Sequence, residues 1–275
     1  MSEQDQNQAS HNPYTASTFS LDEPKYEVNG ELIPNGVKVN AGDAISWLSE
    51  GFDFFKRNPG IWIALVIIYI VVNMVLGLVP FLGRLATTIL APVLTAGLML
   101  GCLAQDQGRE LEIEHLFAGF KRNTGKLVMV GVLSLVAYIA VFVALAIGIA
   151  ILAGGAAMTG ALSGGAQGVM SMMGAGMGIG IALLVLVTVL LLIPVAMATY
   201  YAPALVVFHD LEAIDALKMS FAASLKNLPA LIVLGIVVMV LAVLSVVTLF
   251  LGLLVLLPTA FAAHYVSYKR VFLNR

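Results

Sequence analysis

The fold is decided by residues 127–152, LVMVGVLSLVAYIAVFVALAIGIAIL, which carry no charged side chain. A helix of about 20 apolar residues crosses the hydrocarbon core of a bilayer, so this stretch is long enough to span a membrane. Of the 275 residues, 60% are hydrophobic and 11% are charged, whereas a soluble domain carries about 25% charged residues. Water is therefore not the main solvent of this chain.

Further apolar runs lie on both sides of that stretch. The six predicted spans lie near residues 60–79, 84–104, 127–152, 180–208, 229–248 and 251–268. The last two belong to one nearly continuous apolar run that is too long for a single span, and we expect a turn within 248–252. The sequence predicts an all-α fold, a polytopic transmembrane helical bundle.

Charged residues gather on one side of these spans. Every Lys and Arg falls on that side except Arg84, and so does every acidic side chain. Cytoplasmic loops are enriched in Lys and Arg, so we expect both termini in the cytoplasm. Residues 1–42 are polar and acidic and are predicted to form a disordered cytoplasmic tail, which could bind a protein partner. Residues 43–275 form the predicted membrane domain.

A short motif indicates an internal repeat. Phe55-Lys-Arg-Asn58 recurs as Phe120-Lys-Arg-Asn123 and, more weakly, as Leu225-Lys-Asn227. Each copy ends a stretch with apolar side chains at helical spacing, the first being residues 43–57, and each precedes a span. We predict three helix-hairpin units, about 43–106, 110–210 and 212–272, that each begin with an interfacial amphipathic helix.

The cations of this motif are candidates for contact with lipid. They are Lys56, Arg57, Lys121, Arg122 and Lys226. Each is expected near anionic headgroups, where a cation gains about 1 kcal/mol. Membrane lipids are therefore the predicted partners of this face. The net charge of −2 gives no indication of a nucleic-acid partner.

The second span of each unit contains a proline. These are Pro92, Pro194 and Pro258. Proline removes a helical hydrogen bond and kinks the helix. The kinks either serve only to fit the bundle together or flank a substrate path, as broken helices do in transporters.

Residues 153–180 are rich in Gly and Met and are predicted to form an outer loop, flexible or re-entrant. The alternative is close helix packing through the small-residue spacing of Gly160, Gly164 and Gly168. Five methionines lie here: Met158, Met170, Met172, Met173 and Met177. Thioethers suit Cu(I), but methionine is also a flexible apolar filler.

Chemistry-bearing patterns are scarce. No nucleophile–His–carboxylate arrangement, phosphate-binding glycine loop or metal-ligand spacing occurs, so we expect no enzyme activity and no cofactor. No ionisable side chain lies inside a predicted span, which disfavours ion-coupled transport. Polar groups in the spans either line a path or bond to nearby carbonyls: Asn73, Thr95, Ser134, Tyr138, Thr199, Tyr200 and Ser245. His209, Asp210, His264, Tyr265 and Tyr268 could cluster at the cytoplasmic face.

Several segments resemble an uncharacterised family of proteobacterial multi-pass inner-membrane proteins. They are Trp47-Leu48, Gly51-Phe52, Phe55–Pro59, Ala91-Pro92, Ala96–Met99, His115–Phe120, Ala202–Leu205 and Tyr265–Lys269. The resemblance covers about residues 37–275 and implies the bacterial inner (cytoplasmic) membrane. The architecture is also similar to the membrane domain of some glycerophosphodiester phosphodiesterases, but the soluble catalytic domain is absent from this chain, so that activity is not implied.

These observations lead to three hypotheses. The first is a non-enzymatic role in envelope upkeep or membrane organisation through lipid or partner binding at the cytoplasmic face. The second is a permease or export component for a small apolar or amphipathic solute. The third is copper handling through the outer methionines.

Overall fold

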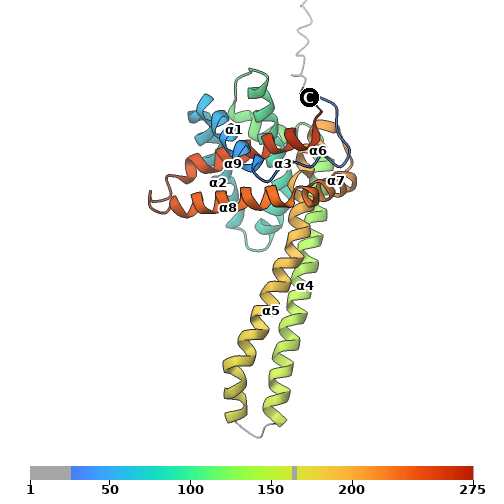
Figure 1. Ribbon diagram of the computed structural model, residues 1–275, viewed down its shortest axis with the longest axis vertical. Coiled ribbons are helices and arrows are strands. Elements are labelled where there is room, and N and C mark those ends of the chain that lie inside the picture. Colours follow the sequence, from blue (N-terminus) through green and yellow to red (C-terminus); the bar gives the residue numbers. More distant parts are fainter. Residues whose placement is uncertain (1–25, 163–165, 275) are drawn as a thin grey trace, which may run out of the picture.

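The computed structural model describes residues 26–162 and 166–274 (Figure 1). Over these residues the chain forms nine α-helices and one 3₁₀ helix and no named strand. The elements are α1 (Asp43–Arg57), α2 (Pro59–Gly77), α3 (Leu82–Asp106), η1 (Ile113–Phe120), α4 (Thr124–Leu162), α5 (Ala166–Tyr200), α6 (Ala202–His209), α7 (Ala213–Lys226), α8 (Leu228–Leu244) and α9 (Leu253–Phe272). The predicted all-α class is confirmed.

The same order of elements occurs three times. A short helix (α1, η1 or α7) precedes a hairpin of two longer helices: α2–α3, α4–α5 and α8–α9. Each short helix packs on the second helix of another hairpin: η1 on α3, α7 on α5, and α1 on α9. The three units therefore close into a ring. This order agrees with the predicted helix-hairpin repeats.

Small residues allow these close packings. A Cβ at Gly51 in α1, or at Gly119 in η1, would lie 2.5 Å or 2.1 Å from a carbonyl oxygen of the facing helix. In α7, the Ser220 hydroxyl donates a hydrogen bond to a facing carbonyl at 2.8 Å. The carbonyls belong to Thr259, Val93 and Met197 in that order. Each follows one of the predicted kink prolines, Pro258, Pro92 and Pro194, so the prolines lie where neighbouring units meet.

The number of spans is smaller than predicted. By length and composition, four described segments can cross a membrane: Pro59–Gly77, Leu82–Asp106, Thr124–Gly155 and Gly178–His209. A fifth counts only if α7 and α8, bent by 84°, form one broken span. The prediction of six is therefore wrong by this measure. The reason is that α8 has only 17 residues and the end of α9 carries Lys269 and Arg270. Both helices run across the direction of α4–α5 (Figure 1).

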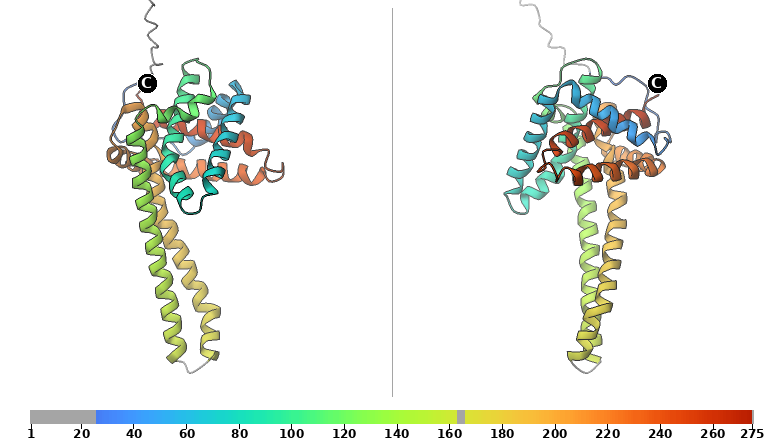
Figure 2. Two further views of the ribbon diagram at one scale, coloured as in Figure 1. Left: turned by 180° about the vertical axis from the view of Figure 1, so that it is seen from behind. Right: turned by 60° about the vertical axis from the view of Figure 1, so that its left-hand side comes forward.

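The α4–α5 hairpin extends well beyond the other helices (Figure 2). Its helices have 39 and 35 residues, which correspond to about 58 and 52 Å. The loop predicted over 153–180 is wrong for the described backbone, because α4 continues to Leu162 and α5 begins at Ala166. A helix pairs the backbone polar groups of this segment within the segment itself.

Two glycines bring α4 and α5 close together. A Cβ at Gly148 would meet the side chain of Leu184, and one at Gly180 would meet that of Leu152. The side chains around the predicted glycine spacing, Gly160, Gly164 and Gly168, lie outside the described residues. Met170, Met172, Met173 and Met177 do as well, whereas the Met158 side chain is exposed.

The prediction of a disordered tail over residues 1–42 is wrong for its described part, residues 26–42. Residues 26–40, here called the N-terminal strap, are held by backbone hydrogen bonds: Ile33 N–H donates to Phe272 and Val37 N–H to Val271. Asn227 binds the strap on both sides, because its Oδ1 accepts from Val39 N–H and its Nδ2 donates to the Val37 carbonyl, both at 2.8 Å. Residues 1–25 lie outside the described part of the chain.

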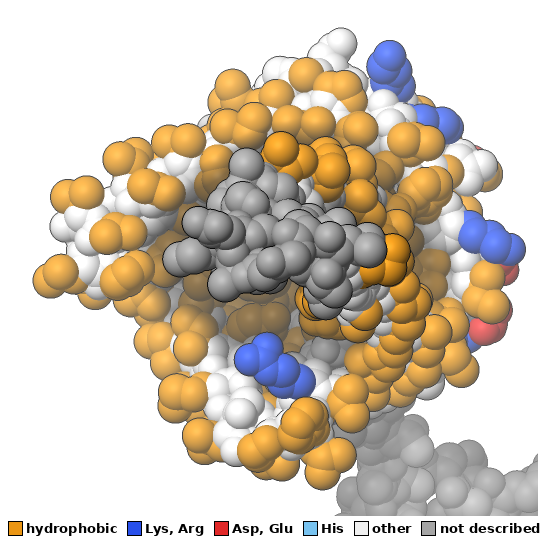
Figure 3. Space-filling model, turned by 90° about the horizontal axis from the view of Figure 1, so that it is seen from below, with side chains coloured by type: hydrophobic (Ala, Val, Ile, Leu, Met, Phe, Trp, Pro, Cys, Tyr) orange, Lys and Arg blue, Asp and Glu red, His pale blue; other side chains and the backbone are white. Residues whose placement is uncertain are grey.

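The core lies at the end of the molecule where α1, α3, α6 and α9 meet. Its largest fully buried aromatic side chains are Trp47, Trp62, Tyr201, Tyr265, Tyr268 and Phe272. Seen from the free end of the α4–α5 hairpin, the surface is mostly hydrophobic, with few charged side chains (Figure 3). This surface matches what a helical bundle presents to hydrocarbon.

Candidate functional site: two adjoining cavities

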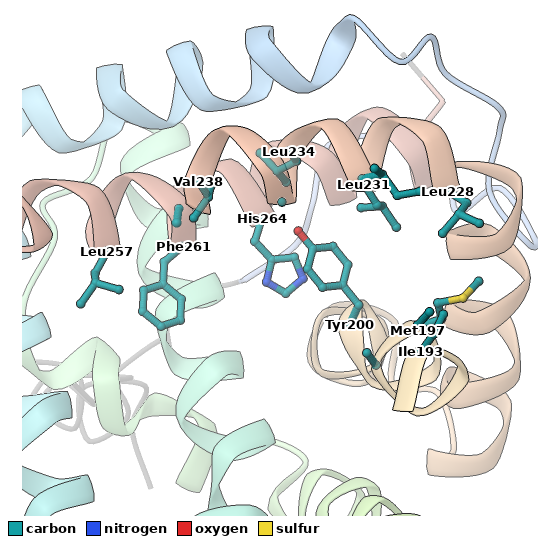
Figure 4. A pocket seen from close by; sticks show the side chains of 14 residues that line it. Ile193, Met197, Tyr200, Leu228, Leu231, Leu234, Val238, Leu257, Phe261 and His264 are labelled. Carbon is teal, nitrogen blue, oxygen red and sulfur yellow. The ribbon is translucent and has the colours of Figure 1, made fainter. Parts of the chain in front are cut away.

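An apolar cavity of about 510 Å³ lies between α5, α8 and α9 (Figure 4). Its lining is aliphatic apart from the rings of Tyr200, Phe261 and His264. The aliphatic residues include Ile193, Met197, Leu228, Leu231, Leu234, Val238 and Leu257. Gly235 also lines this cavity, and a Cβ added there would meet nothing within 4 Å. The cavity therefore offers space and surface suited to a hydrocarbon chain.

A second cavity of about 450 Å³ lies between α3, α4, the α5–α6 junction and α9. It contains five of the polar residues that the sequence placed in spans: Thr95, Ser134, Tyr138, Thr199 and Tyr200. Thr87 and Thr88 also line it, and sequence reasoning missed both. The remaining predicted groups, Asn73 and Ser245, bond to carbonyls of their own helices.

The two cavities share Tyr200, Phe261 and His264, so these three rings lie between them. The ring centroids of Tyr200 and His264 are 4.2 Å apart. The Nε2 atom of His264 is buried without a hydrogen-bond partner. Sequence reasoning placed His264 in a cytoplasmic cluster, but the side chain lies at this junction instead (Figure 4). The unpaired Nε2 atom of His264 thus lies where the apolar lining and the polar lining meet.

Of the other predicted cluster residues, His209, Tyr265 and Tyr268 do come together, whereas Asp210 pairs with Lys126. Tyr268 and His209 form a hydrogen bond of 2.5 Å, and the Tyr265 hydroxyl donates to Asp106 at 3.1 Å. Asp106 is also paired with Lys269. These groups tie the C-terminal ends of α3, α6 and α9 together.

Most hydroxyls of the second cavity already donate to their own helices. Thr87 and Thr88 donate to the Arg84 carbonyl, and Ser134 donates to that of Val130. The Thr199 hydroxyl likewise donates to the Val195 carbonyl. Their oxygen lone pairs can still accept hydrogen bonds. Within the described part of the chain, the hydroxyls of Thr95 and Tyr138 form no hydrogen bond with the protein.

Neither cavity is lined by a Lys, Arg, Asp or Glu of the described chain. The nearest cation in sequence is Arg84, which lies one turn before Thr87 and Thr88 but is not a lining residue. Pro92 and Pro203 line the second cavity. The proline-bearing helices α3, α5 and α9 all contribute to these walls, so both earlier interpretations of the prolines, packing and path, stay predictions.

The predicted headgroup cations have different surroundings. Arg57 donates to the Gln105 carbonyl at 3.2 Å, and Lys226 donates to two carbonyls of the strap. Lys56 lies 2.7 Å from Asp53. Lys121 and Arg122 line a separate charged cavity of about 500 Å³. Arg57 and Lys226 thus have internal partners, and lipid contact by any of the five stays a prediction.

That charged cavity lies beside η1. Its other charged lining residues are Arg109, Glu110, Glu112 and Glu114. Tyr26 forms one wall, with the Arg109 guanidinium 5.0 Å from its ring. His115 is also there, and its burial lowers the pKa of the imidazole below the usual 6.5. The site is therefore balanced in charge rather than purely cationic.

All three short helices expose an apolar stripe. Ile45 and Phe52 of α1 are exposed although Trp47 and Phe54 on its other face are buried. The exposed residues of η1 and α7 are Ile113, Phe117, Phe120, Ile214, Phe221 and Leu225. Three of the four apolar residues at helical spacing in η1 and in α7 thus face outward, as an interfacial helix requires. In α1 only half do, because Phe55 is buried and Leu48 is partly buried. No group of three His, Cys, Asp or Glu side chains in the described residues could hold a metal ion.

The helices and cavities define a polytopic α-helical membrane protein. Over 212 residues, the chain is 27% identical to a probable inner membrane protein of Burkholderia thailandensis, with 72% of this chain and 73% of that protein covered. No protein-family model matches the sequence, and no solved structure is similar to it. The protein is an integral inner-membrane protein. The resemblance to the membrane domain of glycerophosphodiester phosphodiesterases stays a prediction.

Proposed function

We propose that this protein is a non-enzymatic inner-membrane protein that binds an amphipathic molecule taken from the bilayer, and that it serves envelope upkeep through this binding. The observation that carries the proposal is the pair of adjoining cavities, one apolar and one lined by hydroxyls. A bound molecule would place its hydrocarbon chain among α5, α8 and α9 and its head group among α3, α4 and α9. Tyr200 and His264 would contact the point where chain and head group join.

The sizes and linings support this role. Ligand pockets in proteins are mostly apolar cavities of about 300–1,000 Å³ with a few convergent polar groups. The apolar cavity falls within that range at about 510 Å³. Burial of hydrocarbon gains about 25 cal/mol per Å², but only relative to water. Selection against ordinary membrane lipid must therefore come from the polar cavity.

Photolabelling tests the proposal. The purified protein in nanodiscs is irradiated with single-chain lipids that carry a diazirine in the chain and a neutral, anionic or cationic head group. We expect saturable labelling of α8 or α9 by at least one of them, located by peptide mass spectrometry. Labelling that stays unsaturated with all three lipids would contradict the proposal.

Gly235→Leu provides a sharp variant of this test. Gly235 lines the apolar cavity, and a Cβ there meets nothing within 4 Å. Because leucine also favours a helix over glycine, we expect the protein to fold while labelling falls severalfold. Gly60→Leu is the matched control, because a Cβ at Gly60 also meets nothing within 4 Å and Gly60 lines neither cavity.

The permease hypothesis is an extension of the same site. It requires that the bound molecule cross between the two cavities past Tyr200, Phe261 and His264. Proteoliposomes loaded with a labelled amphiphile separate binding from transport: a permease releases the amphiphile to the other leaflet faster than protein-free vesicles, whereas a binding protein does not.

A second candidate function is attachment of the cytoplasmic face to anionic lipid, with both termini in the cytoplasm. It is favoured by the exposed Phe117 and Phe120 next to Lys121 and Arg122, since apolar anchors and cations act together at a membrane surface. Replacement of Lys121 and Arg122 by Gln should reduce co-purifying anionic lipid. Reporter fusions at each terminus test the orientation.

A further inference from the structure

The hydroxyl-lined cavity restricts the chemistry of the head group. Its walls carry Thr and Ser hydroxyls, Tyr138, Tyr200 and His264, and no charged side chain of the described chain. A phosphate or carboxylate placed there would lose its hydration without gaining a cation, which is costly. The charged cavity beside η1 differs, because Arg109, Lys121 and Arg122 line it together with three glutamates.

Most hydroxyls of this cavity are available to a ligand as acceptors rather than as donors. The hydroxyls of Thr87, Thr88 and Ser134 donate back to their own helices, so toward the cavity they act as acceptors. Thr95 and Tyr138 have no protein partner in the described chain and can donate or accept. A well-matched head group therefore brings its own O–H or N–H donors and has at least one acceptor.

We infer that the ligand is an uncharged amphiphile with a hydrogen-bond-donating head group, such as a hydroxyl or amide, held between Thr95, Tyr138 and His264, with its chain in the apolar cavity. This inference rests on the proposed function and adds the chemical class of the ligand. Anionic lipids are excluded from this site even though they can bind elsewhere on the protein.

The test compares two competitors that share one chain and one glycerol. The photoactivatable neutral lipid is displaced by 1-oleoyl glycerol or by 1-oleoyl glycerol 3-phosphate, which differ only in the phosphate. We expect the phosphate form to compete at least about a hundredfold less well. Oleylamine, with the cationic head group, should also compete weakly, because no lining carboxylate can pair with it.

The two unpartnered hydroxyls provide the matched variants. Thr95→Val and Tyr138→Phe should each weaken the binding of 1-oleoyl glycerol about fivefold, which is the effect expected from the loss of one neutral hydrogen bond. Displacement by 1-octadecene, which has no polar head group, should stay unchanged. Thermal stability without ligand should also stay unchanged, because neither hydroxyl has a partner to lose within the described chain.

The outcomes separate the two proposals. If none of the lipids labels the cavity saturably, both the proposed function and this inference are wrong. If labelling is saturable but the phosphate or amine competes as well as 1-oleoyl glycerol, the inference is overturned and the proposed function stands. A phosphate preference that disappears in Arg84→Gln would place the head group outside the hydroxyl cavity and would also overturn it. An unchanged affinity of Thr95→Val and Tyr138→Phe for 1-oleoyl glycerol would also overturn the inference.

Discussion

The two ends of the helical hairpins are held in different ways. At the charged end, polar groups join segments far apart in the sequence: Arg57 to Gln105 and Asn227 to the strap. At the α8–α9 turn, Val247 and Leu249 are more than four-fifths exposed. Polar contacts thus hold the charged end together, whereas the apolar α8–α9 turn is left to surrounding lipid.

The largest effect is expected from Gly51→Leu at the charged end. The new side chain would collide with the backbone of α9, because even a Cβ there lies 2.5 Å from the Thr259 carbonyl oxygen. We expect a loss of at least about 3 kcal/mol of stability, measured by thermal unfolding in detergent. Gly77→Leu is the control, since that position is open. Equal melting temperatures for the two variants would show that α1 does not pack on α9.

The second-largest effect is expected from Asn227→Ala. It removes the part-buried hydrogen bonds to the Val39 N–H and the Val37 carbonyl, and a typical neutral hydrogen bond contributes about 0.5–1.5 kcal/mol. We expect faster hydrogen exchange in the strap, measured by mass spectrometry. Asn58→Ala is the comparison, because it removes a helix cap rather than a contact with the strap. Protection of residues 33–40 that is the same in both variants would contradict this role.

A smaller effect is expected from acid at His115. Burial lowers the pKa of this imidazole in the folded protein below its ordinary 6.5, with smaller opposing effects from Glu112 and Glu114. Between the lowered pKa and 6.5 the unfolded state binds more protons, so stability falls as the pH drops through this window. Melting temperatures from pH 7.5 to 5 should therefore decline less in His115→Gln. An identical decline would assign the effect to other groups.

The smallest effect is expected at the apolar end. Val247→Ala removes methyl groups that contact little protein, so stability in detergent should change by less than about 0.5 kcal/mol. Ala262→Gly is a buried comparison in α9. If Val247→Ala destabilised the protein as much, the α8–α9 turn would be packed against something, and the contrast between the two ends would fail.

The prediction of six spans shows a limit of hydropathy. Residues 228–268 read as two spans joined by a turn within 248–252 because apolar letters dominate. The chain does turn between α8 and α9, but α8 has only 17 residues and the end of α9 carries Lys269 and Arg270. Length, hydropathy and charge are properties of one segment at a time. Whether a segment crosses the bilayer or lies against its neighbours depends on packing that the segment alone does not encode.

The sequence by itself determined the all-α membrane class, the concentration of charge at one face and the three-fold order of elements. These follow from local composition and spacing. Only the tertiary structure decided that Thr95, Ser134 and Tyr138 share one cavity, that His264 faces Tyr200, and that Arg57 and Lys226 bond inside the protein. The reason is that each of these facts is a distance between residues on different helices, set by the packing of the small residues where the units meet.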